Sequence, residues 1–101
     1  MKMPIPKTIR IGRKTYRVTQ PQQMRKKSTK GDITFEEKHI QVAKSCTVTE
    51  RKYSPKERAE TFWHEVTHGI LEDMDHPLAY NEKFVVAFSQ RLNTVIHSAE
   101  F

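Results

Sequence analysis

Apolar and polar residues alternate along the first part of the chain and then recur every three or four residues along the second. The alternation predicts four short strands, at residues 8–11, 14–19, 32–36 and 39–44. The helical spacing predicts one helix ending near residues 73–75 and a second from residue 78 or 80 to residue 97. Strands followed by helices indicate an α+β fold: a small, mainly antiparallel sheet of N-terminal hairpins packed on two C-terminal helices.

The first predicted helix has a well-defined start. Ser54-Pro55-Lys56-Glu57 combines a capping box with proline at the first helical position, where no N–H is needed. His76-Pro77 would stop the helix. One side of the helix is apolar and should pack in the core, through Ala59, Phe62, Trp63, Val66, Ile70 and Met74. His64 and His68 lie away from that side, so the helix presents two imidazoles on a different face.

These histidines belong to the pattern His64-Glu65-Val66-Thr67-His68, which is H-E-x-x-H. In a helix, positions 64 and 68 lie one above the other, so both imidazoles can bind one tetrahedral Zn²⁺. Glu65 points about 100° round the helix from His64, where it can act as general base on a metal-activated water. The alternative is a surface helix that carries these residues by chance.

Catalytic zinc sites usually take a third ligand from the protein. Glu82 is a candidate because it falls within the apolar arc of the second helix, about 60° from Val85 and about 40° from Val86. A carboxylate there is costly unless it is paired or bound to a metal. Alternatively, Glu82 reaches water at the first helical turn, where its charge suits the helix dipole. Other candidates for the third ligand lie between the helices, namely His76, Asp73 and Asp75.

The metzincin arrangement does not fit, because Leu71 and Met74 occupy the positions of its glycine and third histidine. The chain instead resembles the ImmA/IrrE-like metallopeptidases, in the very small form encoded by phages and prophages. The motif helix carries the specific part of the resemblance. Further similarity covers Ile9–Val18, Gly31–Phe35, His39–Val42 and Glu82–Phe88. Residues 20–30 fall outside it.

This resemblance implies a gluzincin-type zinc metallopeptidase, in which His64, His68 and Glu82 bind Zn²⁺ and Glu65 is the catalytic base. Some gluzincins carry an acidic residue one turn after the third ligand, where it supports a zinc-bound histidine. Val86 stands there in this chain. The outer partners of the ligands are therefore unassigned. Candidates for oxyanion stabilisation are proposed by residue type alone: Tyr53, Tyr80, His76 and His97.

The resemblance also indicates how a peptide or protein substrate would bind. The strand 39–44 leads toward the motif helix and is expected to form an exposed sheet edge beside the metal, with Lys44 or Ser45 at its end. An extended substrate could add to this edge through main-chain hydrogen bonds. The main apolar contacts of the core are expected to include Trp63, Phe62, Phe88 and Leu92.

Length and composition bound the remaining possibilities. The 101 residues should form a single domain, with a polar, basic and flexible loop at residues 20–30. No apolar run is long enough for a membrane span, and no signal peptide precedes the first strand, so a cytoplasmic location is expected, in the host if a phage encodes the chain. The single Cys46 excludes an internal disulfide and is expected to be a small buried or half-buried residue.

The charge distribution leaves two further functions open. Residues 1–30 carry ten Lys or Arg and no acidic residue, whereas residues 31–101 carry eight basic and twelve acidic ones. A basic N-terminal third would suit a nucleic-acid-associated accessory protein, although a solvated face of a hairpin is the better explanation for the strands. The basic loop at residues 20–30 fits a solvated connector and a phosphate contact equally well. A non-catalytic binding module that keeps zinc as structure is the other alternative to the peptidase.

Overall fold

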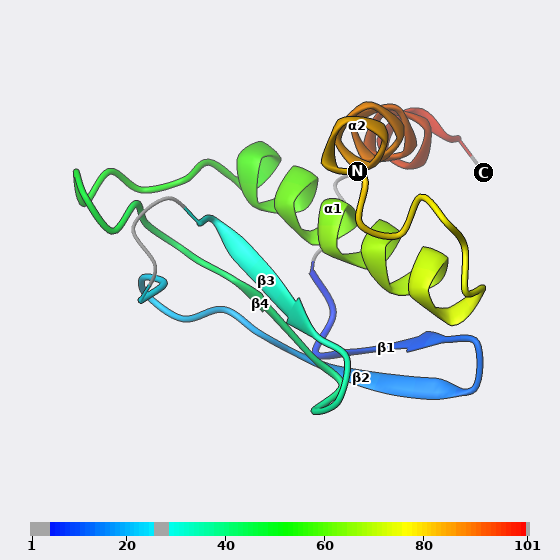
Figure 1. Cartoon of the computed structure of the whole chain (residues 1–101). Coiled ribbons are helices and arrows are strands. Elements are labelled where there is room, and N and C mark those ends of the chain that lie inside the picture. Colours follow the sequence, from blue (N-terminus) through cyan, green and yellow to red (C-terminus); the bar gives the residue numbers. More distant parts are fainter. Residues whose placement is uncertain (1–4, 26–28, 101) are drawn as a thin grey trace.

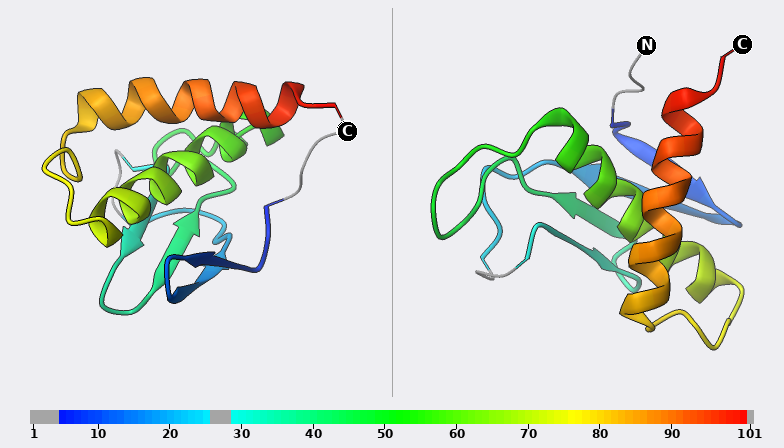
Figure 2. Two further views of the ribbon diagram at one scale, coloured as in Figure 1. Left: turned by 90° about the vertical axis from the view of Figure 1, so that its right-hand side faces the viewer. Right: turned by 90° about the horizontal axis from the view of Figure 1, so that it is seen from above.

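The protein, represented by a computed structural model that describes residues 5–25 and 29–100, is built in three layers. A four-stranded sheet forms the first, and helices α1 and α2 form the second and third (Figures 1 and 2). The elements are β1 Thr8–Ile11, β2 Lys14–Thr19, β3 Gly31–Thr34, β4 His39–Val42, α1 Pro55–Asp73 and α2 Glu82–Ser98. The prediction that both helices pack on the sheet is wrong: α1 covers the sheet, and α2 packs on α1. The fold class is α+β, as predicted.

The sheet has the order β1-β2-β4-β3 and is mixed, because β2 and β4 run parallel while the other two pairs are antiparallel. The expectation that the 39–44 strand forms an exposed edge is therefore wrong, since β4 is paired on both sides. Ile40 and Val42 are fully buried, which suits a central strand. The edge next to α1 is instead β3, which contains Gly31 and Asp32 and is less buried than β4.

The main core lies between the sheet and the apolar face of α1. Its buried members are Ile11, Tyr16, Val18, Ile40, Val42, Phe62 and Val66. Gly69 lets the helix approach the sheet closely, because a Cβ there would meet the side chains of Ile11 and Ile33. Trp63 is only partly buried at the margin of this core. Ile70 and Met74, predicted to pack, are exposed.

Helix α1 begins as predicted. The Ser54 hydroxyl accepts a hydrogen bond from the Glu57 N–H, and the Glu57 carboxylate accepts one from the Ser54 N–H. The same carboxylate binds Arg51 in a bidentate ion pair, with N–O distances of 2.9 and 3.0 Å. These contacts hold the pKa of Glu57 at about 2, with the Arg51 hydrogen bonds as the main cause. The start of the helix that carries the histidines is thus fixed by several local bonds.

Helix α2 is turned so that its most apolar side does not face α1. Its buried residues are Val85, Ser89 and Asn93. Phe88 is 47% exposed and Leu92 half-buried, so the prediction that they are main core contacts is wrong. Glu82 occupies the same side of the helix as Val85 and Ser89, because residues three and seven positions apart share a helical face. The orientation that directs Glu82 toward α1 therefore leaves Phe88 in solvent.

Half of the predicted flexible loop is anchored in the structure. The carbonyls of Pro21 and Gln22 accept hydrogen bonds from the N–H groups of Lys44 and Ser45, and Met24 is buried beside Ala43. Residues 26–28 lie outside the described part of the chain. Cys46 is half-buried, as predicted. Within the residues described, neither helix combines the length and apolar character that crossing a membrane requires.

Candidate metal centre

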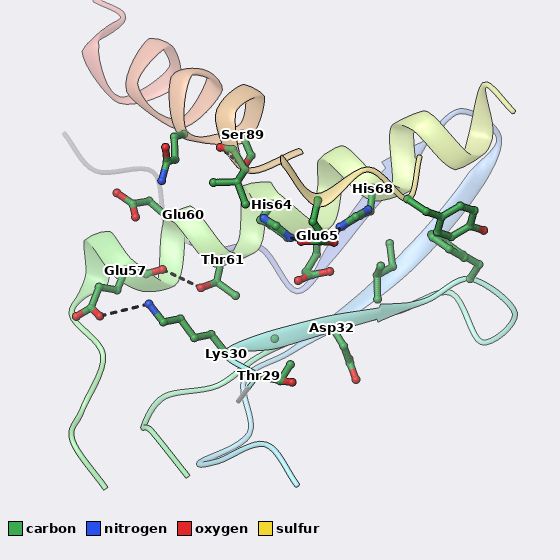
Figure 3. A pocket seen from close by; sticks show the side chains of 17 residues that line it. Thr29, Lys30, Asp32, Glu57, Glu60, Thr61, His64, Glu65, His68 and Ser89 are labelled. Carbon is green, nitrogen blue, oxygen red and sulfur yellow. Dashed lines mark hydrogen bonds and ion pairs between the residues drawn. The ribbon is translucent and has the colours of Figure 1, made fainter. Parts of the chain in front are cut away.

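The two motif histidines lie on the side of α1 that faces a groove (Figure 3). His64 and His68 are one helical turn apart, with ring centroids separated by 4.9 Å and planes inclined at 69°. Most of each ring is shielded from solvent by the surrounding elements. The helix thus presents two imidazoles side by side, as the spacing predicts.

Glu82 reaches this pair from the first turn of α2. One carboxylate oxygen, Oε2, lies 3.2 Å from His64 Nε2, and the other, Oε1, lies 2.6 Å from His68 Nε2. The side chain of Asn81 accepts a hydrogen bond from the Phe84 N–H and so fixes the start of α2. The Glu82 side chain is 65% exposed, so it lies over the groove and not in an apolar core. Its contacts with both imidazoles nevertheless bring together the three side chains predicted as ligands, and their role as ligands stays a prediction.

The loop between the helices determines which ring nitrogen of His68 faces Glu82. Its Nδ1 lies 2.7 Å from the carbonyl oxygen of Ala79, which can only accept a hydrogen bond, so Nδ1 carries a hydrogen. A neutral ring then has a lone pair at Nε2, directed at Glu82. Two lone pairs 2.6 Å apart require a proton or a cation between them. Sequence reasoning missed Ala79, because its contribution is a backbone carbonyl that no side-chain motif can reveal.

Glu65 is the most strongly perturbed carboxyl group of the site. It is buried, and its carboxylate oxygen and one nitrogen of each histidine all lie within 4.8 Å of one another. Burial, followed by the charges of Glu82 and Asp32, raises its pKa to about 8. Burial also lowers the pKa of His64, as does His68, while Glu82 opposes the shift. At neutral pH the protein without metal therefore holds a protonated Glu65 beside a neutral His64.

The groove itself has a volume of about 830 Å³ and runs between α1, α2 and the edge strand β3. It is lined by Thr29–Ile33, Phe35, Glu57, Glu60, Thr61, His64, Glu65, His68, Tyr80, Glu82, Val86, Ser89 and Gln90. Val86 therefore faces the space beside Glu82, and no carboxylate occupies that position. The contribution of β3 and of Phe35 was missed from the sequence, because it depends on which strand forms the edge.

The other candidates for a third ligand lie elsewhere. His76 Nδ1 accepts a hydrogen bond from the Leu78 N–H and is used within its own turn. The Asp73 carboxylate lies against Gly12 in the β1–β2 turn, and Asp75 is an exposed turn residue with positive φ. Of the candidates for oxyanion stabilisation, only Tyr80 lines the groove. His97 Nδ1 bonds the Asn93 carbonyl, and Tyr53 packs with Met24 and Ala43.

Comparisons with known proteins do not assign this chain to a family. The features that bear on its function are the groove, the histidine pair and the carboxyl groups of Glu65 and Glu82. A search of family models, of curated proteins and of solved structures finds no match.

Proposed function

We propose that the protein is a zinc-dependent metallopeptidase of gluzincin type. His64, His68 and Glu82 would bind the ion, and Glu65 would act as general base. The observation that carries the proposal is the position of the Glu82 carboxylate, which contacts Nε2 of both motif histidines. The three side chains come from two helices, so their convergence is not a consequence of spacing within α1 alone.

The chemistry of the donors fits zinc. Two imidazole nitrogens and a carboxylate oxygen are a common ligand set for catalytic Zn²⁺, which keeps a further position open. His68 donates its Nδ1 hydrogen to the Ala79 carbonyl, as zinc-bound histidines usually do with their second nitrogen. The lone pair at Nε2, otherwise unfavourable beside a carboxylate, is then available to a cation.

The buried carboxyl group of Glu65 is suited to proton transfer. When bound, zinc would polarise the scissile carbonyl and make a water molecule more acidic. Glu65 lies close to both histidines but takes no part in the Glu82 contacts, so it is free to take a proton from water and pass it to the leaving amine. Its raised pKa, about 8 without metal, means that it holds a proton readily in this environment.

Substrate would lie in the groove against β3. Among the described residues, β3 pairs only with β4, so its other edge has main-chain groups free for an extended peptide. Gly31, Asp32 and Ile33 of this strand line the groove beside the histidines. We therefore propose β3, in place of the 39–44 strand, as the strand that would recognise the substrate main chain.

Metal analysis and hydrolysis measured on the same preparations test the proposal. Wild-type protein should bind about one zinc per chain and cleave an unstructured protein such as casein. Glu65→Gln should keep the zinc and lose cleavage, whereas His64→Ala should lose both. If the wild type binds zinc but cleaves no peptide, the non-catalytic zinc-containing module becomes the better interpretation. If it binds no zinc at all, the metal site itself is wrong.

A second candidate function rests on the outer face of the sheet. Arg10 and Arg17 are exposed on the side of the β1–β2 hairpin that α1 does not cover, and no described residue forms an ion pair with either. Such a face could contact phosphates of a nucleic acid. Binding that weakens steeply with salt in wild-type protein, but is lost in Arg10→Ala/Arg17→Ala, would favour this function.

A further inference from the structure

The groove beside the histidines has two chemically different ends. Near His68 it is lined by Ile33, Phe35 and Tyr80, whereas its other end is lined by Lys30, Glu57, Glu60 and Thr61. We propose that Phe35 and Tyr80 form a subsite for a bulky apolar side chain of a peptide substrate, on the amino-terminal side of the bond that is cleaved. This inference rests on the proposed peptidase function and adds to it a substrate class and a direction of binding.

Two neighbouring residues hold Tyr80 in place beside the site. On one side, the carbonyl of buried Ala79 accepts the hydrogen bond from His68. On the other, Asn81 caps helix α2. The backbone of Tyr80 is thus fixed between a residue that touches the candidate metal centre and the start of the helix that carries Glu82. Its side chain lines the same groove as His64 and His68.

Phe35 extends this aromatic surface beside Tyr80. It directly follows β3 and packs against the main core, so its position is set by the sheet. The rings of Phe35 and Tyr80 meet edge to face, with centroids 6.3 Å apart and planes inclined at 74°. This arrangement is a favourable one for aromatic pairs and leaves ring surface of both open to the groove.

Tyr80 is 74% exposed, which is unusual for a large aromatic side chain held between two fixed residues. An apolar side chain placed against it and Phe35 would remove this surface from water, which is favourable. The opposite end of the groove offers no aromatic surface, because the side chains that line the rest of it are charged or polar apart from Val86 of α2. The apolar preference should therefore apply to one side of the scissile bond only.

The direction of β3 decides which side. A Cβ at Gly31 would meet Thr61, whereas the side chain of Ile33 lies close to Gly69, so β3 runs alongside α1 in the same direction. Phe35 follows at the His68 end. A peptide that adds to the free edge in the more stable antiparallel sense runs the opposite way, from Phe35 toward Thr61. Residues before the scissile bond then lie against the aromatic pair.

Digestion of a mixture of random peptides, followed by sequencing of the products, measures this preference. Wild-type protein should release products with Phe, Leu or Met enriched at or next to the new carboxyl terminus. Tyr80→Ala should lower kcat/KM for such peptides about 10- to 100-fold, and Tyr80→Phe should restore it.

Tyr80 is exposed, so Tyr80→Ala should fold. Phe35→Ala is a second test, and its kcat/KM is compared only if its circular dichroism spectrum is that of the native protein. Val95→Ala, on an exposed part of α2 away from the groove lining, is the matched control and should have no effect.

A binding experiment separates this inference from the proposed function. The same peptides are passed over immobilised Glu65→Gln protein, with and without Tyr80→Ala. Three outcomes would overturn the subsite but not the proposed peptidase function. They are cleavage without apolar enrichment, cleavage with enrichment on the carboxyl side of the bond, and cleavage that Tyr80→Ala does not affect. Retention of apolar peptides that depends on Tyr80, without any cleavage by wild type, would overturn the peptidase and support the apolar subsite. Neither cleavage nor retention would overturn both.

Discussion

The carbonyl oxygen of Ala79 and Nδ1 of His68 lie 2.7 Å apart, although eleven positions separate the two residues in the chain. This bond joins the inter-helix loop to the C-terminal half of α1 and turns His68 Nε2 toward Glu82. It also explains the orientation of α2, since the helix starts three residues after Ala79 and carries Glu82 in its first turn. The position of the third candidate ligand thus depends on a backbone contact.

The stability of the protein should depend on zinc. If zinc binds only the native state, a thousandfold excess over Kd adds about 4 kcal/mol to the free energy of unfolding. Removal of metal with a chelator should then lower Tm by roughly 10 °C or more for a domain of this size. Differential scanning calorimetry of wild type with zinc and with EDTA measures this difference directly.

Three variants identify the residues responsible for that shift. His64→Ala and Glu82→Ala should show the same Tm with zinc and with EDTA, because each lacks one of the proposed ligands. Glu65→Gln should keep the shift, because Glu65 is proposed to act as base and not as a ligand. A wild-type Tm that responds to neither zinc nor EDTA would contradict the metal site.

The buried Glu65 should make the metal-free protein less stable at alkaline pH. Its folded pKa, about 8, lies above the ordinary value of 4.5, so the native state binds more protons than the unfolded state between these values. The stability that protonated Glu65 contributes is therefore fully present below about pH 4.5 and is lost progressively as pH rises from there through about 8. Urea unfolding in EDTA from pH 6.5 to 9 should show this loss in wild type and a flatter profile in Glu65→Gln. Equal slopes would show that the carboxyl group is not buried in the metal-free protein.

Substitutions of two phenylalanines should have unequal costs. Phe62 is buried between α1 and the sheet, so Phe62→Ala should cost about 3–5 kcal/mol of unfolding free energy. Phe88 is half exposed and belongs to none of the buried core clusters, so Phe88→Ala should cost less than about 1.5 kcal/mol. Urea denaturation of both variants in EDTA measures the contribution of the core to the free energy of unfolding without that of bound metal. A similar cost for the two would mean that Phe88 is covered in solution.

Features that depend on residues close together in the chain could be predicted from the sequence. Alternation located β1 and β2, the capping box located the start of α1, and helical spacing put His64 beside His68. Pairing between segments distant in the chain could not be predicted. β4 is central because it pairs in parallel with β2, and no turn signal in the sequence specifies this parallel pairing. The rotation of α2 was also missed, because the apolar periodicity favours burial of Phe88, whereas the helix is oriented with Glu82 toward the histidines.

Zinc binding should release a proton from Glu65. Without metal this carboxyl group has a pKa of about 8 and is mostly protonated at pH 7. A divalent cation held by His64, His68 and Glu82 favours the charged form of a carboxylate so close to it, and therefore lowers its pKa. Isothermal titration calorimetry at pH 7 in buffers of different ionisation enthalpy counts the protons released. The wild type should release about one proton more than Glu65→Gln, which keeps all three proposed ligands. Identical proton release in the two proteins would mean that Glu65 is already ionised before metal arrives, and that the burial raising its pKa is relieved in solution.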